Sequence, residues 1–173
     1  MSAAVEPAET DEQWDRLVVA PHSYAEASGC TGVILRAVAA GRRVGVVVLT
    51  AGDAHQKAAA AAARKQLDEL VPEDLDNLPA LRQRHTLEAM PQLGVKPRDL
   101  LFLGYPDGGM AEIYEAQDDT TYRSPLTQKA ETYGVVVPDY HTQAHGRPAP
   151  YRKQSVTDDL VEAASRWLEE DPD

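Results

Sequence analysis

The sequence predicts an α/β protein built on a parallel sheet, and three segments carry that prediction. Residues 17–20 and residues 44–49 (VGVVVL) are short continuous apolar runs, the pattern of parallel strands that are covered on both faces. An apolar helical stripe lies between the two runs and is closed by Gly41. Its members are Val33, Ile34, Ala37 and Val38. Strand, helix and strand in this order predict a right-handed βαβ unit.

Two helices are expected before the next strand. An alanine-rich segment predicts the first of them over residues 55–70, because alanine has the highest helix propensity. The second is expected over residues 78–93, with Asn77 as its N-cap and Gly94 as its stop signal. Pro91 should distort the last turn of this helix.

The rest of the chain predicts one more buried strand and one more helix. Residues 100–103 (LLFL) form the third strand, and residues 156–169 form an amphipathic final helix. Between them, residues 110–154 have little helical period and many turn-forming residues. We expect this segment to be a long excursion, with residues 135–137 as a candidate short strand. A fourth strand should follow the final helix, yet the sequence ends before one.

Length and charge limit the classes of function. The chain has 173 residues, enough for one domain, which we expect over residues 14–173 after a disordered tail at residues 1–13. Its 28 acidic and 17 basic side chains give a net charge of −11, so we expect neither nucleic acids nor membranes as partners. Cys30 is the only cysteine, which excludes an internal disulfide. Without a long apolar run or a basic leader, the sequence predicts a cytoplasmic protein.

Chemistry-bearing residues gather after each predicted strand. In an open parallel sheet the ligand crevice lies outside the carboxyl ends of the strands, so these positions are the ones to weigh. They are His22, Tyr24 and Glu26 after the first strand, Thr50, Asp53 and His55 after the second, and Tyr105 and Asp107 after the third.

The segment PHSYAEASGCTG, residues 21–32, resembles the opening motif of the PIG-L/LmbE-like deacetylases, in which Pro-His-Pro-Asp-Asp-Glu leads into a glycine-rich turn. The resemblance continues in register through most of the chain. Its further stations are residues 49–53 (LTAGD), 93–95 (LGV), 103–108 (LGYPDG), 123–125 (RSP) and 158–160 (DDL).

This resemblance implies a fold, a reaction and a metal. The implied fold is a Rossmann-like three-layer sandwich with a mostly parallel sheet, here C-terminally truncated, because the family's distal histidine stretch would lie beyond residue 173. The implied reaction removes an acetyl group from an amino sugar or a related small molecule, with zinc activating water. Carried over, His22 is a metal ligand, Tyr24 holds the position of the catalytic base and Ala25 that of a carboxylate ligand.

The motif departs from the family at the positions that carry its chemistry. Alanine offers no lone pair to a metal, and a neutral tyrosine is a poor base for water. His85 stands where the family usually has a glutamate. We therefore expect a degenerate zinc site with no cofactor, in a catalytically impaired relative that binds a small molecule. The alternative is an active zinc-dependent de-N-acetylase or amidohydrolase with a rebuilt site.

A rebuilt site would draw on the remaining histidines. His141 and His145 are spaced i, i+4, which would place both imidazoles on one helical face, although residues 139–148 read as a loop. His22 and His55 are the other candidates. A loop or a substrate contact is the competing interpretation of the histidine pair.

The candidate substrate-binding residues are Asp53, Tyr105, Asp107, His141 and His145. Several residues also have structural interpretations. His22 could cap the helix or bond a backbone carbonyl, and Glu26 could face the helix dipole. His85 is expected to face Leu78 and Leu81 rather than a metal.

The sequence also predicts self-association. In the family, the strand expected after residue 173 flanks the first strand, so without it a long apolar edge would be exposed. Either residues 135–137 or a second copy of the chain should cover that edge, and a homodimer or larger assembly is expected.

Overall fold

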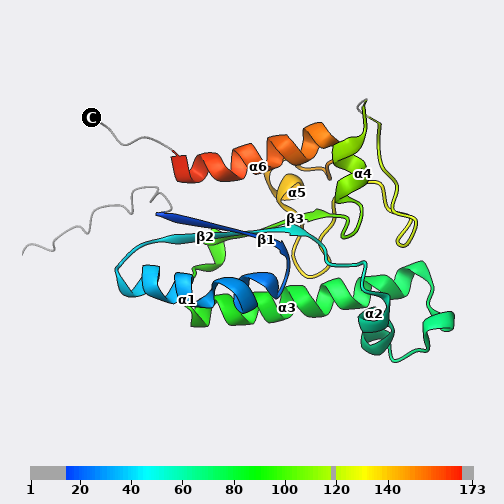
Figure 1. Cartoon of the computed structure of the whole chain (residues 1–173), viewed down its shortest axis with the longest axis horizontal. Helices are drawn as coiled ribbons and strands as arrows, with labels where there is room; N and C mark the ends of the chain where they lie inside the picture. Colours follow the sequence, from blue (N-terminus) through cyan, green and yellow to red (C-terminus); the bar gives the residue numbers. More distant parts are fainter. Residues whose placement is uncertain (1–14, 118–119, 169–173) are drawn as a thin grey trace, which may run out of the picture.

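The computed structural model describes residues 15–117 and 120–168, and the predicted disordered tail lies outside them. Its sheet has three parallel strands in the order β1-β2-β3: β1 (Arg16–His22), β2 (Val44–Thr50) and β3 (Leu100–Tyr105). Together with the flanking helices (Figure 1), this sheet confirms the predicted α/β fold.

The helices form two layers, one on each face of the sheet (Figure 1). One layer holds α1 (Ala25–Ala39) and α3 (Asn77–Gln92), with α2 (Gln56–Ala63) beside α3. The other layer holds α4 (Met110–Glu115), α5 (Tyr140–His145) and α6 (Lys153–Leu168). The long excursion between β3 and α6 therefore contributes two short helices to the layer that α6 completes.

The sheet is buried on both faces, which explains why its strands are continuous apolar runs. Val46 and Val48 of β2 pack with Ile34 on the α1 and α3 side. Val47, between them, packs with Tyr105 on the α4, α5 and α6 side. Each face thus has its own apolar core, and the central strand contributes to both.

Helix ends account for most of the differences from the predicted boundaries. The helix expected over residues 55–70 ends at Ala63, because Arg64 adopts a left-handed conformation with φ of 57°, and 3₁₀ turns follow at Leu67–Glu69 and Pro72–Asp76. Asn77 is the first residue of α3 rather than its N-cap. The predicted stop at Gly94 follows Leu93 with φ of 86°.

Residues 135–137 do not form the candidate strand. Their three backbone N–H groups converge on Gln83 Oε1 of α3, at 3.3, 2.7 and 3.3 Å. Within the described residues β1 pairs with β2 alone, and Val19 on β1 is 51% exposed. Coverage of this edge by a second copy stays a prediction.

None of the helices within residues 15–117 and 120–168 combines the length and apolar character that a membrane span requires.

Candidate functional site

The carboxyl ends of the three strands meet at one edge of the sheet. The register pairs His22 with Thr50 and Thr50 with Tyr105, so the residues that follow each strand begin at the same level. Thr50 Oγ1 donates to the Pro21 carbonyl at 2.8 Å, which joins the ends of β1 and β2. The His22 ring turns back onto its own loop, where Nδ1 donates to the Ser23 carbonyl at 3.0 Å.

Tyr24, which holds the family's catalytic-base position, bonds to helix α3. Its hydroxyl lies 2.6 Å from His85 Nδ1, and the two rings stack with centroids 5.8 Å apart. The Arg82 guanidinium lies 5.6 Å from the Tyr24 ring centroid, and its Nη1 donates to the Gly52 carbonyl at 2.7 Å. His85 is exposed and partners Tyr24; its position four residues after Leu81 keeps it on the helix face that was expected for it.

Asp53 is a buried junction of three chain segments. Its Oδ1 accepts the backbone N–H of Asp107, and its Oδ2 accepts the Tyr133 hydroxyl, both at 2.9 Å. Burial raises the pKa of the Asp53 carboxyl, and the two hydrogen bonds partly oppose that rise. Burial, with Asp53 nearby, also raises the pKa of the Tyr133 phenol, so Tyr133 stays the donor. Asp53 therefore fixes the strand-end loops.

Glu26 is the second buried acid at this edge. It lies in the first turn of α1, as a residue facing the helix dipole would, and is 1% exposed. Its Oε1 accepts the Thr86 hydroxyl at 2.8 Å, while its Oε2 has no hydrogen-bond partner among the described residues.

A small cavity also lies at this edge of the sheet. Its volume of about 20 Å³ is enough for about one water molecule, and its lining includes Ser23, Thr50 and Gln83.

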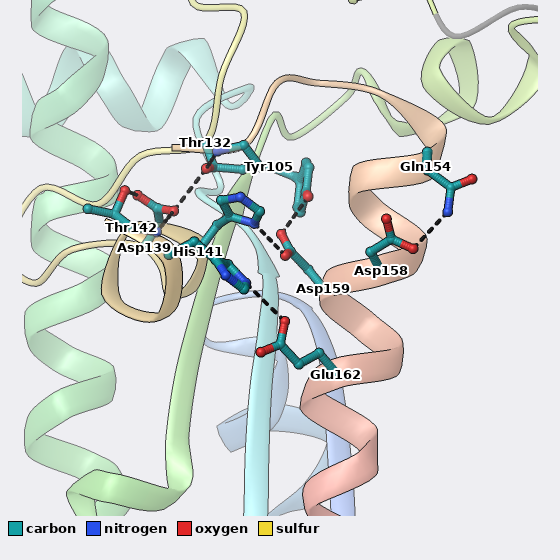
Figure 2. Close-up of polar contacts among 11 residues, drawn as sticks. Tyr105, Thr132, Asp139, His141, Thr142, Gln154, Asp158, Asp159 and Glu162 are labelled. Atoms are coloured by element: carbon teal, nitrogen blue, oxygen red, sulfur yellow. Dashed lines mark hydrogen bonds and ion pairs between the residues drawn. The ribbon is translucent and has the colours of Figure 1, made fainter. Parts of the chain in front are cut away.

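A separate polar cluster joins α5 to α6 on the other face of the sheet (Figure 2). Asp159 of α6 is 1% exposed; its Oδ2 accepts the Tyr105 hydroxyl at 2.6 Å, and its Oδ1 lies 2.8 Å from His141 Nδ1. His145 Nε2 lies 3.0 Å from Glu162 Oε2. The His141 and His145 rings are in contact, with centroids 4.4 Å apart.

The sequence around α5 explains why a helix forms where a loop was predicted. Asp139 is the N-cap, and its Oδ1 accepts the backbone N–H of Thr142 at 3.0 Å. The same oxygen accepts the Thr132 hydroxyl at 2.8 Å, which anchors the cap to the preceding segment. Gly146 ends the helix in a left-handed conformation with φ of 73°. The i, i+4 spacing of the histidines therefore places both rings on one helical face.

The described residues contain one group of three side chains with metal-ligand spacing. It consists of His141, His145 and Asp159, whose ligand atoms all lie within 4.8 Å of one another. His22 lies outside the group, and so does His55, which accepts the Ala58 N–H as the N-cap of α2.

The structure divides the predicted substrate-binding residues between two places. Asp53 and the half-buried Asp107 are linked at the strand ends, whereas Tyr105, His141 and His145 gather around Asp159. Their role toward a substrate stays a prediction.

Sequence reasoning missed Asp159 and Glu162 as partners of the histidines. Their i, i+3 spacing on an amphipathic helix was the available signal.

Comparison with protein families gives one match, to the family described as PIG-L: GlcNAc-PI de-N-acetylase, over residues 17–167. Neither the curated proteins nor the solved structures gave a significant match. The matched segment runs from β1 into α6 and includes both the strand-end edge and the α5–α6 cluster. The chain belongs to the PIG-L family of GlcNAc-PI de-N-acetylases, as the resemblance of its motifs predicts.

Proposed function

We propose that this chain is a catalytically impaired PIG-L family protein that binds a small polar molecule, related to the amino sugars of its family, at the strand ends without hydrolysing it. The observation that carries the proposal is the hydrogen bond between Tyr24 and His85, formed where the resemblance places the catalytic carboxylate. A phenol bonded to an imidazole neither holds zinc as a carboxylate does nor removes a proton from water at neutral pH.

The residues at this edge do not fit a catalytic zinc ion. Such a site needs three protein ligands and an open position for water. Ala25 has no donor atom, and Tyr24 is engaged with His85. His22, whose Nδ1 donates to the Ser23 carbonyl, could supply one ligand through Nε2, which is one of the three that are needed. The buried Asp53 accepts bonds on both oxygens, from Asp107 and Tyr133, and the buried Glu26 accepts one from Thr86, which supports a structural role for them.

The same residues suit recognition of a polar ring. Tyr24 and His85 are both exposed and present a stacked aromatic pair with polar atoms at its rim. Arg82 behind them is held by the Gly52 carbonyl, which keeps positive charge beside the pair. Aromatic side chains with a few placed polar groups are the usual lining of small-molecule sites.

The proposal is tested by measuring binding and hydrolysis on the same protein. Calorimetry with N-acetylglucosamine and glucosamine should show binding that weakens about fivefold in Tyr24→Ala, since a lost aromatic contact is worth about 1 kcal/mol. The matched control is Tyr114→Ala, because Tyr114 is 70% exposed on α4 and belongs to the other layer. Acetate release from N-acetylglucosamine should be undetectable with or without added zinc. Chelator-sensitive acetate release that disappears in His22→Asn would overturn the proposal.

A further inference from the structure

We propose that His141, His145 and Asp159 bind a divalent transition-metal ion between α5 and α6. Two imidazoles and one carboxylate form a donor set suited to Zn²⁺, Co²⁺ and Ni²⁺. Mg²⁺ and Ca²⁺ prefer oxygen ligands alone and are not expected here. The site is distinct from the strand-end position of His22, which belongs to no such group among the described residues.

The separations between the donor atoms are close to those of a bound ion. Bonds of about 2.0–2.1 Å in tetrahedral geometry place ligand atoms about 3.3 Å apart. His141 Nδ1 and Asp159 Oδ1 are 2.8 Å apart, and the ligand atoms of all three residues lie within 4.8 Å of one another. The side chain of His145 is 41% exposed, so its ring has room to rotate toward the other two ligands. The same exposure gives the ion a path from solvent.

A second layer of hydrogen bonds holds the ligands in place, as it does in metal sites generally. Tyr105 on β3 donates to Asp159 Oδ2 at 2.6 Å (Figure 2). Glu162 lies 3.0 Å from His145 Nε2 and serves as the carboxylate partner of that imidazole.

Charge favours a cation at this position. Asp159 is 1% exposed, and it bonds the Tyr105 phenol and the His141 imidazole. A buried carboxylate needs hydrogen-bond donors or positive charge, and a divalent ion supplies more positive charge than one protonated histidine. The net charge of −11 attracts cations to the molecule as a whole.

The ion would connect the excursion to the last helix. Two ligands come from α5 and one from α6, so binding should stabilise the packing of these helices. Three protein ligands would leave one position for water.

Metal titration of the chelator-treated full chain tests the proposal. We expect one Co²⁺ or Zn²⁺ per chain by calorimetry, visible absorption bands of tetrahedral Co²⁺, and a higher melting temperature with zinc. Loss of one ligand in His145→Asn or Asp159→Asn should weaken binding by about 100-fold, and loss of the supporting hydroxyl in Tyr105→Phe by about tenfold. His145 is exposed, and an asparagine at position 159 can accept from Tyr105 through its oxygen and donate to an unprotonated His141 Nδ1 through its nitrogen, so these variants should fold, which circular dichroism checks.

The matched control is His22→Asn, which should bind the ion like the natural chain. Binding that survives both His145→Asn and Asp159→Asn would overturn the proposal, and so would binding lost in His22→Asn or the absence of any one-to-one binding. The absence of one-to-one binding would leave the proposed function intact. Metal binding that depends on His22 would count against both this proposal and the proposed function.

Discussion

At Gly104 the backbone of the excursion, at Tyr133, packs closely against strand β3. Gly104 lies on β3 with φ of 76°, and a Cβ built on it would be 2.2 Å from the Tyr133 carbonyl oxygen and 2.9 Å from the Tyr133 nitrogen. In Gly104→Ala the left-handed conformation costs about 1 kcal/mol. The contact with rigid backbone adds about 1–3 kcal/mol. We therefore expect the free energy of unfolding to fall by about 2–4 kcal/mol, or the melting temperature by about 5–15 °C.

Two other glycines separate the two contributions. Gly146 also has positive φ, of 73°, but nothing within 4 Å of its Cβ position, so Gly146→Ala should cost only the conformational part. Gly29 lies inside α1 with open space around it, and Gly29→Ala should stabilise the chain by about 0.5–1 kcal/mol. Urea unfolding of the three variants measures all three values. If Gly104→Ala and Gly146→Ala cost the same, the close packing of Tyr133 against β3 is not what holds the excursion.

Three further predictions concern single contacts. Because burial raises the pKa of Asp53 in the folded state, its contribution to stability is present below about pH 3.8 and is lost as pH rises through the folded pKa. Asp53→Asn should therefore gain stability relative to the natural chain as pH rises above about 3.8, and a constant difference in urea unfolding would contradict this. Tyr105→Phe should lower the free energy of unfolding of the metal-free chain by about 1.5–3 kcal/mol, because buried Asp159 loses a donor; a change below about 0.5 kcal/mol would show that this bond does not hold the cluster. Light scattering at micromolar concentration should show a homodimer or larger assembly that Val19→Lys weakens, and a monomeric natural chain would refute pairing through β1.

The sheet could be predicted from sequence because strands that are buried on both faces are apolar at nearly every position. Residues 44–49 are apolar throughout, and the structure places Val46 and Val48 in one core and Val47 in the other. The end of α2 could not be predicted, since Arg64 adopts positive φ without being a glycine. Residues 135–137 are three valines, a strand-like run, yet Gln83 from a distant helix takes their backbone N–H groups. A tertiary contact thus overrides local propensity there.

In the candidate site, too, sequence spacing could be read from the chain, whereas contacts between residues far apart in the sequence could not. The i, i+4 spacing of His141 and His145 identified the pair, although the shortness of α5 concealed the helix. Their acidic partner could not be found in the same way, because Asp159 comes into reach only when α6 packs on the sheet. Asp53 is a similar case. It was predicted to contact a substrate, and the Tyr133 hydroxyl that it accepts comes from 80 residues further along the chain.

The buried acids suggest where metal chemistry is favoured in this chain. Glu26, Asp53 and Asp159 are each at most 2% exposed, so each needs hydrogen-bond donors or positive charge. Asp53 receives bonds on both oxygens and Glu26 on one, from hydroxyl and backbone groups that are not metal ligands. Asp159 alone among these three lies against imidazole nitrogen, a group that can either carry a proton or share a cation. If a divalent ion binds this chain, the same electrostatic reasoning that argues against His22 argues for the cluster between α5 and α6.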